Sequence, residues 1–510
     1  MGFMSAEERA LAAALSRLGY ANPFLPERIE AEGAALGPAF VHADRVWSVR
    51  TDRTVQNPNV ARLAERATTL AALLRERLAA GAEPAESDRV LYEDVVLYLL
   101  YTRYEDDLLD LVVKAADAGD TGRRVPFYEK FRADCQHFLD LSGAALPGHH
   151  EPAHLFACLF QVRRAFHHIF WHIIGGSMSM ARLRAAVWQS IFTHDMRRYR
   201  RALYERMDDV TTLIGGPSGT GKEVVARAIG LSRYIPFDAR AHRFAAHFGD
   251  LFHPLNLSAL SPTLIESELF GHRRGAFTGA LQDRAGWLEM CEPFGTVFLD
   301  EIGDVDPAIQ VKLLRVLQAR TFQRLGDTKP LLFRGKIMAA TNRDLAREIQ
   351  AGRFREDFYY RLCSDIIATP SLAEQLRESP DELPNLILFL ARRLVGDEEA
   401  PALADEVQAW IEKHLGPTYP WPGNVRELEQ CVRNVLIRGE YRPPTARDGH
   451  PEGQLAAALR AGALTADQLL ARYCALVYAE TQSYQETARR LGIDRRTVKS
   501  KVAQYKTDGR

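Results

Sequence analysis

The feature that most constrains this chain is a glycine-rich stretch at residues 216–223, Gly-Pro-Ser-Gly-Thr-Gly-Lys-Glu. It follows an apolar run at 210–214 and precedes a helical pattern at 224–229, which is the strand–loop–helix context of a phosphate-binding loop. Glycines let successive backbone N–H groups turn towards an anion, and the helix N-terminus and Lys222 add positive charge. Glu223 stands where such loops often carry a hydroxyl ligand for magnesium. The alternative interpretation is a glycine-rich turn without a ligand.

Two later strand patterns end in polar side chains that suit a nucleotide site. Residues 295–301 form an apolar run that ends in Asp300 and Glu301. We expect Asp300 to hold magnesium and Glu301 to polarise the attacking water, because an ATPase needs both beside its phosphate loop. The run 337–342 ends in Asn342, which we expect near the γ-phosphate. The pattern therefore predicts ATP and Mg²⁺ as cofactors, and the alternative is a buried strand with a polar end.

Two further stretches suggest contacts with other molecules. Residues 275–280 read Gly-Ala-Phe-Thr-Gly-Ala, so glycines bracket Phe277 and Thr278 in a predicted mobile hairpin tip. Phe277 either contacts a partner or folds back on its own domain. Arg355 and Arg361 can reach the phosphates of a neighbouring subunit, or they are simply part of a solvated helix face.

Composition limits the class of protein. The 510 residues suggest about three domains, and 46% hydrophobic with 26% charged residues is ordinary for a globular protein. The net charge of −1 means that any nucleic-acid surface must be local. Six scattered cysteines, no signal pattern and no long apolar run predict a soluble cytoplasmic protein without disulfides or a membrane segment.

The first 170 residues or so are predicted to be mostly helical. Apolar residues recur in steps of three and four, and the helical patterns cover 60–74, 90–113, 127–141 and 154–172. Histidines and one aspartate raise the question of a metal or haem site, but the carboxylate–histidine pattern is incomplete, so ordinary amphipathic helices are the favoured interpretation. Those residues are Asp134, His137, His149, His150, His154, His167, His168 and His172. We expect a regulatory module of unknown ligand.

The C-terminal third is predicted to be helical with two linkers. Residues 380–384 are expected to lead into a helical lid with patterns at 388–394 and 407–415 and a helix starting near Asn424. A second linker is expected from 439 to about 453. The tail then shows a helix at 484–491, a glycine turn, and a helix at 495–505 capped by Asp494.

The tail also concentrates positive charge. Residues 489–510 carry an excess of six positive charges, which with the helix–turn–helix pattern predicts DNA binding. The alternative is a basic helical end without a role in DNA binding. The residues expected to reach bases or phosphates are Arg495, Arg496, Thr497, Lys499 and Ser500.

From Ile173 to the C-terminus, the chain resembles the sigma-54-dependent transcriptional activators, also called bacterial enhancer-binding proteins. The resemblance rests on motifs that occur in the family's order, and the segment ARRLGIDRRTVKSKV is similar to the family's Fis-type helix-turn-helix. The motifs are GPSGTGKE, ESELFGHRRGAFTGA, GTVFLDEIGDV, KLLRVLQ, AATNRDL, GRFREDFYYRL and WPGNVREL.

The resemblance implies a multidomain fold: an α-helical N-terminal module, an α/β AAA+ P-loop ATPase core with a helical lid, and a C-terminal all-α helix-turn-helix. Expected boundaries are 1–172 for the module, 173–375 for the core, 376–440 for the lid, 441–460 for a linker and 461–510 for the DNA-binding domain. The family assembles as a ring, usually a hexamer, and a dimer at rest is left open.

The resemblance also implies roles for residues. Asn256 matches an asparagine that links γ-phosphate sensing to loop movement through the Walker B glutamate, here Glu301. Asn342 matches sensor I, and Arg426 matches sensor II. Arg355 and Arg361 match arginine fingers. The residues expected to bind the nucleotide are Ile174, Gly216, Pro217, Ser218, Gly219, Thr220, Gly221, Lys222, Glu223, Asn256 and Arg426. The residues expected to act in catalysis are Asp300, which is also the metal ligand, Glu301, Asn342, Arg355 and Arg361. The residues expected to contact sigma-54 are Gly275, Ala276, Phe277, Thr278, Gly279 and Ala280.

The chain departs from the family pattern in several places. Pro217 replaces a more usual Glu, and Arg273 and Arg274 replace Glu-Lys. Extra residues are inserted around 192–209 and 234–252. The N-terminal region matches no sensor module that could be named.

The implied function is ATP-driven remodelling of the closed sigma-54 RNA polymerase complex by a ring bound to upstream double-stranded DNA. The N-terminal module would respond to an unknown signal or partner. Two alternatives are a DNA-binding regulator that does not act through sigma-54 and a general AAA+ remodelling ATPase.

Overall fold

The computed structural model describes residues 3–42, 48, 57–118, 124–141, 146–148, 151–246, 251–443, 455, 459 and 464–508. The chain divides into two compact units, Met1–Val432 and Arg433–Arg510. Most of the predicted linker at 441–460 and both His149 and His150 lie outside the described residues. In the described ranges, no helix is long and apolar enough to cross a membrane.

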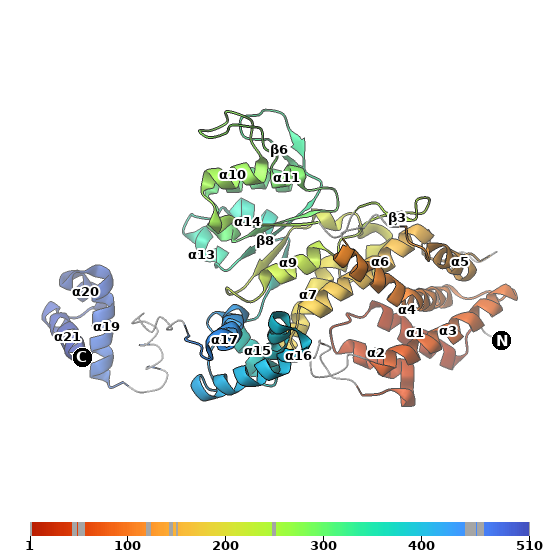
Figure 1. Cartoon of the computed structure of the whole chain (residues 1–510), viewed down its shortest axis with the longest axis horizontal. Helices are drawn as coiled ribbons and strands as arrows, with labels where there is room; N and C mark the ends of the chain where they lie inside the picture. The colour runs from red at the N-terminus through yellow and green to blue at the C-terminus, as the bar shows by residue number, and fades with distance from the viewer. Residues whose placement is uncertain are drawn as a thin grey trace. The chain divides into compact units, whose positions relative to one another are not determined.

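The first unit begins with a bundle of helices (Figure 1). Ser5 caps the first helix through a capping box with Glu8, which satisfies backbone N–H groups at the helix start. The four predicted helical patterns are confirmed, and two shorter helices precede them. The helices are α1 (Ala6–Tyr20), α2 (Glu27–Leu36), α3 (Pro58–Ala79), α4 (Glu86–Ala118), α5 (Tyr128–Leu139) and α6 (Pro152–His172).

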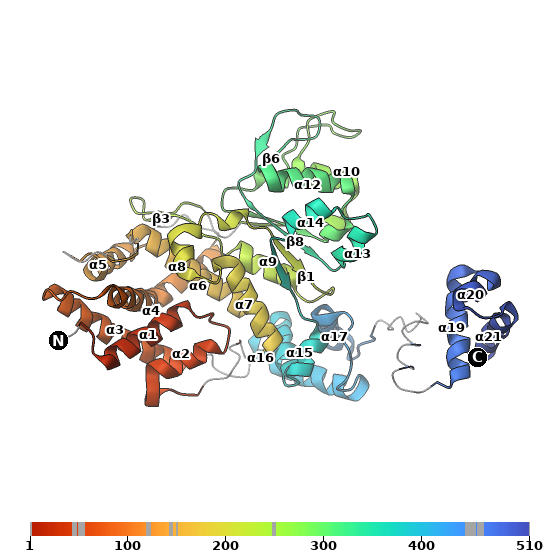
Figure 2. The same cartoon turned by 180° about the vertical axis from the view of Figure 1, so that it is seen from behind.

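A five-stranded parallel sheet forms the centre of the first unit (Figures 1 and 2). Its strand order is β4-β5-β8-β1-β9. Because all the strands are parallel, the residues that follow them meet along one edge of the sheet. The strands are β1 (Thr212–Gly215), β4 (Phe252–Asn256), β5 (Thr296–Asp300), β8 (Lys336–Thr341) and β9 (Asp365–Ala368).

Helices cover both faces of this sheet, as a parallel sheet requires. Alternate residues of one strand face opposite cores: Ile214 packs with α6, α7 (Met178–Phe192) and α9 (Lys222–Gly230), whereas Leu213 belongs to the core on the other face. Helices on that other face are α10 (Pro262–Phe270), α11 (Trp287–Met290), α12 (Pro307–Ala319), α13 (Leu345–Gln350) and α14 (Glu356–Leu362).

A helical lid follows the sheet, and its start differs from the prediction. The linker expected at 380–384 is only partly right, because α16 (Glu382–His414) already begins at Glu382 and Pro384 lies in its first turn, where proline is tolerated. Gly396, with φ of 81°, interrupts α16 between the two predicted helical patterns. The remaining lid helices are α15 (Leu372–Glu378) and α17 (Asn424–Arg438).

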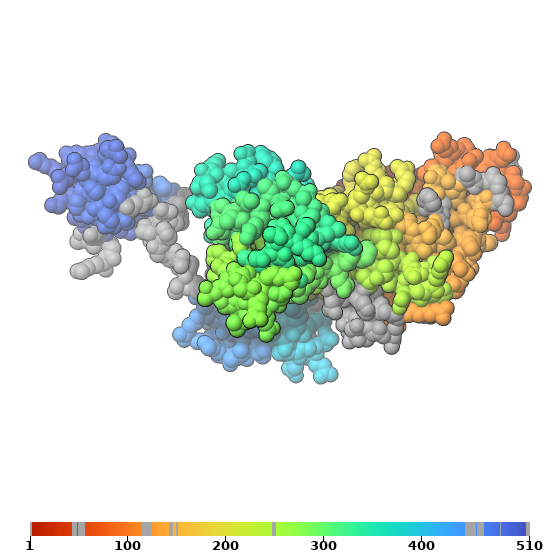
Figure 3. Space-filling view, turned by 90° about the horizontal axis from the view of Figure 1, so that it is seen from above, coloured from red at the N-terminus to blue at the C-terminus, as the bar shows by residue number. Residues whose placement is uncertain are grey.

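The two insertions relative to the family pattern pack against the N-terminal helices (Figure 3). The first contains α8 (Met196–Arg198) and a π-helical turn (Tyr199–Leu203), and the second contains the hairpin β2 (Phe237–Asp238) and β3 (Arg243–Phe244). In the second insertion, the Phe237 ring lies 4.7 Å from Phe156 and the Phe244 ring 4.3 Å from Phe160 of α6. The insertions therefore add to the surface that α7 and α9 present to α6 of the bundle.

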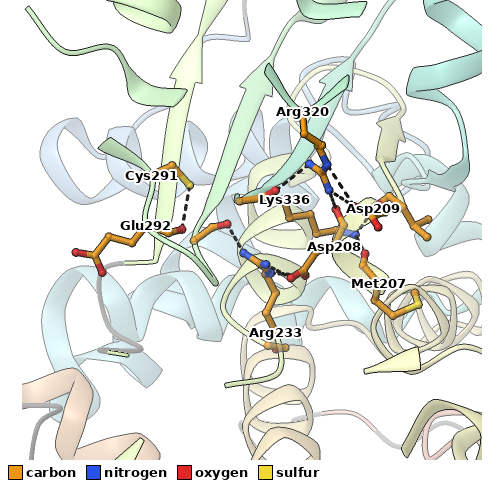
Figure 4. A network of polar contacts seen from close by, with 12 residues as sticks. Met207, Asp208, Asp209, Arg233, Cys291, Glu292, Arg320 and Lys336 are labelled. Carbon is orange, nitrogen blue, oxygen red and sulfur yellow. Dashed lines mark hydrogen bonds and ion pairs between the residues drawn. The ribbon is translucent and has the colours of Figure 1, made fainter. Parts of the chain in front are cut away.

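A polar network fixes the first insertion to the sheet (Figure 4). Lys336, at the start of β8, donates to the backbone oxygens of Met207 (3.0 Å) and Val210 (2.6 Å). Arg320 donates to the backbone oxygen of Asp208 at 2.7 Å, and Arg233 pairs with the Asp208 carboxylate. Burial lowers the pKa of Lys336 to about 8. This network anchors the strand ends opposite the phosphate loop.

The second unit ends in three short helices. Cys474, Val498 and Val502 form their common core, and Gly492 with φ of 65° makes the turn between the last two helices. These helices are α19 (Ala466–Thr481), α20 (Tyr484–Leu491) and α21 (Arg495–Asp508). The predicted fold class, with helical N-terminal module, α/β core, helical lid and all-α C-terminal part, is confirmed.

Candidate nucleotide site

The glycine-rich loop joins β1 to α9, and its glycines adopt backbone conformations that other residues avoid. Gly216, Gly219 and Gly221 have φ of 145°, 79° and 89°. A Cβ on Gly216 would lie 2.2 Å from the Thr369 hydroxyl, and one on Gly219 would lie 2.3 Å from the Gly423 oxygen. Glycine is thus required both by the turn and by close approach of β9 and the lid.

Lys222 begins α9 and turns back over the loop. Its Nζ donates to the backbone oxygens of Gly216 (3.1 Å) and Pro217 (3.2 Å). Burial lowers the pKa of Lys222, while the nearby Glu301 and Asp300 carboxylates oppose that shift. A buried ammonium held in the centre of a glycine loop is the arrangement that binds the outer phosphates of a nucleotide.

The two carboxylates lie at the end of β5, at the same edge of the sheet. Burial raises the pKa of Asp300, although the Glu301 N–H and the Lys222 ammonium work against this. Glu301 has φ of 56°, an uncommon left-handed conformation that is typical of functional positions. Its carboxylate accepts a hydrogen bond from the Asn342 N–H at 3.3 Å. The sheet thus holds Glu301 between the ends of two strands.

Asn256 lies opposite Asp300 in the register of β4 and β5. Its side-chain oxygen accepts hydrogen bonds from the N–H of Ser258 (3.0 Å) and from its hydroxyl (2.8 Å). The contact with Glu301 that the resemblance implies is not among the bonds of Asn256 in the described part of the chain. Asn256 therefore lies near the site, but its side chain is bonded to the neighbouring Ser258 in this state.

The lid contacts the loop through a residue that the sequence analysis placed only at a helix start. Asn424 Nδ2 donates to the Ser218 oxygen at 2.9 Å, and its Oδ1 accepts from the Leu372 N–H at 2.8 Å. Asn424 has φ of 54°, which asparagine tolerates well, so its place after Pro-Gly was the available signal. Arg426 lies beside Gly219, because a Cβ there would be 3.0 Å from the Arg426 Cβ.

Three other candidates have contacts of their own. Thr220 bonds both the Pro217 oxygen (2.9 Å) and the Thr369 hydroxyl (2.7 Å), so Thr369 at the end of β9 is a loop partner that the sequence analysis missed. Ile174 follows α6 and packs, half-buried, against the core that includes α9. Glu223 is exposed and pairs with Arg227 at 3.4 Å.

The two candidate arginine fingers do not contact their own loop. Arg355 precedes α14 and binds Asp357 through its guanidinium, with distances of 3.0 and 2.8 Å. Arg361 lies exposed on α14. Within the described ranges, no hydrogen bond or ion pair joins either arginine to the phosphate loop. Both are on the surface, where a neighbouring molecule could meet them.

The loop at 275–280 forms consecutive turns, and an antiparallel bridge between His272 and Arg284 pairs its two arms. The Gly275 N–H donates to the Ala280 oxygen at 2.8 Å, and Gly275 and Gly279 have φ of 79° and 103°. Phe277 is half-buried and its ring lies 5.0 Å from the His272 ring, while Thr278 is exposed. Of the two predicted alternatives, Phe277 folds back in this state.

A second loop, missed by the sequence analysis, holds the base of the first. It connects β6 (Thr321–Phe322) to β7 (Leu331–Leu332). Arg273 donates to the Leu325 oxygen at 3.0 Å through its N–H and to Asp327 at 2.8 Å through its side chain. Arg273, one of the departures from the family pattern, is thus a link between the two loops.

The described histidines of the N-terminal region lie among other partners than a set of metal ligands. Among the described residues, no group of three or more His, Cys, Asp or Glu side chains could hold a metal ion. Asp134 instead binds Arg103 (2.8 Å) and the Tyr104 hydroxyl (2.7 Å). His168 and His172 lie with His167 near the end of α6, where burial lowers the pKa of each.

In the second unit, α21 presents the residues expected to contact DNA. The Asp494 carboxylate accepts from the Arg496 N–H at 2.6 Å, which confirms the predicted helix cap. Thr497 is half-buried, whereas the other candidates are exposed: Arg495, Arg496, Lys499 and Ser500. Lys501, by contrast, is tied to Asp467 of α19 and belongs to the fold.

A family model described as the Sigma-54 interaction domain matches residues 191–367. The Nif-specific regulatory protein of Azotobacter vinelandii is 44% identical over 231 residues, which cover 45% of this chain and 40% of that protein. The transcriptional regulatory protein ZraR of Salmonella typhi is 39% identical over 308 residues, or 58% and 63% of the two chains. The chain therefore spans about 40 to 63% of these curated relatives.

Among solved structures, NtrX from Brucella abortus in complex with ATP is 24% identical with a TM-score of 0.38, covering 68% of this chain and 72% of that one. The sequence matches carry the assignment. The resemblance to sigma-54-dependent activators is confirmed for the α/β core, which contains the nucleotide site and the loop at 275–280.

Proposed function

Because residues 191–367 form a sigma-54 interaction domain, we propose that the chain is an ATP-hydrolysing transcriptional activator that opens promoter complexes of sigma-54 RNA polymerase. The observation that carries the proposal is the convergence of Lys222, Asp300 and Glu301 at one edge of the sheet, in the domain that also presents the loop at 275–280.

The side chains at this edge divide the work of hydrolysis. The loop N–H groups and Lys222 bind the phosphates, and Arg426 approaches them from the lid. Asp300 would hold Mg²⁺, which neutralises charge on the phosphates when bound, and the donor set fits because Asp300 is a half-buried carboxylate facing the loop lysine. Glu301 orients and polarises the attacking water, while its bond to the Asn342 N–H fixes its direction.

Hydrolysis in this proposal takes place between subunits of a ring, which we expect to be a hexamer. Arg355 and Arg361 are exposed and have no bond to their own phosphate loop within the described ranges, so each is available to a neighbour's nucleotide. An arginine supplied by a second subunit stabilises the charge that develops on the phosphate.

The loop at 275–280 transmits the change to the polymerase. In this state Phe277 packs on His272, and Arg273 ties the loop to the β6–β7 loop. Contacts to the γ-phosphate would bias these loops between a folded and a released state, as in other nucleotide switches. Released Phe277 and Thr278 contact sigma-54, and α21 holds the ring at an upstream DNA site.

The substitution Thr278→Ala tests this function, with Thr263→Ala on α10 as control because both threonines are exposed. We expect Thr278→Ala to keep ATP turnover and DNA binding but to reduce open-complex formation to background in a reconstituted sigma-54 transcription assay. Thr263→Ala should behave like the unchanged protein. Full transcription by Thr278→Ala would reject the contact loop, and ATP turnover without any sigma-54 binding would favour a regulator that does not act through sigma-54.

A further inference from the structure

A large cavity lies within the first unit, between the N-terminal bundle and the ATPase core. Its volume is about 840 Å³, within the range of sites for drug-sized ligands. Its wall comes from α1, α2, α3, α4 and α6 of the bundle and from α7 and the first insertion of the core. None of the residues of the nucleotide site lines it.

The cavity is mainly apolar, with aromatic rings on the side that belongs to α6 and α7. Phe166 and Trp171 come from α6, and Trp188 and Phe192 come from α7. Rings favour flat apolar ligands, because stacked and edge-on contacts add to the burial of area. The wall therefore suits an aromatic molecule better than a sugar or a peptide.

One part of the wall is polar and not fully satisfied. Arg163 and His167 stand one turn apart on α6, and the buried Nε of Arg163 and Nδ1 of His167 have no hydrogen-bond partner among the described residues. Tyr101 and Glu105 of α4 lie beside Arg163, and burial raises the pKa of both. The Arg163 guanidinium bonds Tyr101, but its Nε–H has no partner among the described residues. A buried N–H without a partner is costly, so an oxygen acceptor at this place would be favourable.

The helix that carries these groups also contacts the phosphate-loop helix. Gln161 of α6 donates to the backbone oxygen of Ser232 at 2.9 Å, and Arg164 donates to that of Arg233. Both carbonyls follow the end of α9, whose first residue is Lys222. A ligand that shifts α6 would therefore also shift α9, the helix that begins with Lys222.

We propose that this cavity is the effector site of the regulatory module, and that it takes a flat, mainly apolar aromatic molecule with an oxygen acceptor that binds Arg163. Occupancy changes ATP turnover through α6 and α9, a step that rests on the function proposed above. This proposal gives the chemical class of the ligand to which the N-terminal module responds.

Two fluorescent probes that differ by one group test the binding part. 1-Anilinonaphthalene-8-sulfonate carries acceptor oxygens, and N-phenyl-1-naphthylamine is the same ring system without them. We expect the full chain, without nucleotide, to bind one molecule of either. Arg163→Met should weaken the sulfonate probe about tenfold, the loss of one charged hydrogen bond, and leave the uncharged probe within twofold. Arg182→Met, an exposed arginine of α7 outside the cavity, is the matched control.

Filling the cavity gives the second arm. Ala64→Trp on α3 places an indole in the cavity and should abolish binding of both probes, whereas Ala72→Trp, exposed on the same helix, should not. Far-ultraviolet circular dichroism and thermal melting establish whether each variant is folded. If Ala64→Trp does not fold, Ala61→Trp repeats the test from another residue of the cavity wall. Probe binding that survives a folded cavity-filling variant, or equal responses of both probes to Arg163→Met, would overturn the site.

Turnover assays separate the effector role from the ATPase itself. Saturating sulfonate probe, or the Ala64→Trp indole, should change ATP turnover at least threefold, while Ala72→Trp leaves it unchanged. Unaltered turnover under both conditions would overturn the effector role. If the chain hydrolyses no ATP at all, the proposed function fails, but the probe titrations still decide whether the cavity is a binding site.

Discussion

The nucleotide edge of the sheet and the junction between bundle and core are built in opposite ways. At the edge, the functional groups are held mostly by backbone atoms, as Lys222 is by two carbonyl oxygens and Glu301 by one N–H. At the junction, charged side chains are paired across the two parts: Arg200 with Glu93 at 2.7 Å and Arg197 with Asp94.

The two regions therefore serve different purposes: the edge carries the groups for the reaction, and the junction stabilises the fold. Groups at the edge must be free to exchange their partners for phosphates, water or a neighbouring subunit, so they contribute little to stability. The pairs at the junction are partly or fully desolvated, so removing one partner leaves an uncompensated charge. Substitutions at the edge should therefore change turnover with little effect on unfolding, and substitutions at the junction should do the reverse.

The largest expected effect is at the edge. Arg355→Ala should lower ATP turnover about ten-thousandfold without changing the melting temperature, because an arginine finger acts only on the transition state. Arg353→Ala, an exposed arginine two residues away that pairs with Glu348, is the control and should be close to normal. Mixing Arg355→Ala with Lys222→Ala subunits should restore turnover; no rescue would argue against action between subunits.

Glu301→Gln should lower turnover about a thousandfold while ATP still binds, since the amide keeps the size of the side chain but cannot act as a base. Single-turnover hydrolysis and a fluorescent-nucleotide titration measure the two steps. Turnover near the normal rate would show that another group activates the water. A large fall in melting temperature would contradict the expectation that substitutions at the edge have little effect on unfolding.

At the junction, Arg200→Met should destabilise the first unit by about 3 kcal/mol, because the buried Glu93 carboxylate then loses the guanidinium charge that faces it. Arg198→Met removes an exposed pair with Asp195 and should change stability by less than about 1 kcal/mol. Urea unfolding followed by circular dichroism compares the two. Equal effects would mean that the junction is not held by its buried charges.

The smallest expected effect depends on pH. Burial lowers the pKa of His167 to about 4, below its ordinary value of 6.5. The unfolded chain therefore binds a proton first as the pH falls, so the stability contributed by neutral His167 is present above pH 6.5 and is lost progressively between pH 6.5 and 4. His167 is partly exposed, so solvent screening reduces the loss to about 1 kcal/mol at pH 5.

His167→Phe should flatten this dependence, which thermal melting at pH 7 and pH 5 measures. His154→Phe is a less suitable comparison, because His154 binds Tyr234 at 2.8 Å. His137→Phe, at an exposed position of α5, serves as the control. An unchanged slope in His167→Phe would assign the pH dependence to other groups.

Much of the site could be predicted from sequence because its parts are local. Gly216 to Lys222 carry their own turn and helix start, and Asp300 and Glu301 follow an apolar strand directly. The partners of these groups could not be predicted in the same way. Asn424 and Thr369 contact the loop from positions that are about 200 and 150 residues away along the chain. The residues next to them in the sequence give no sign of these contacts.

The sequence alone determined that the chain contains a nucleotide-binding α/β core with two accessory helical parts, because glycine turns, strand ends and helix stripes are encoded within short windows. Only the tertiary structure decided why residues 192–209 and 234–252 are there, which way Phe277 folds, and that a cavity lies beside Arg163. These are properties of distant segments brought together, and packing between such segments depends on three-dimensional fit rather than on local periodicity.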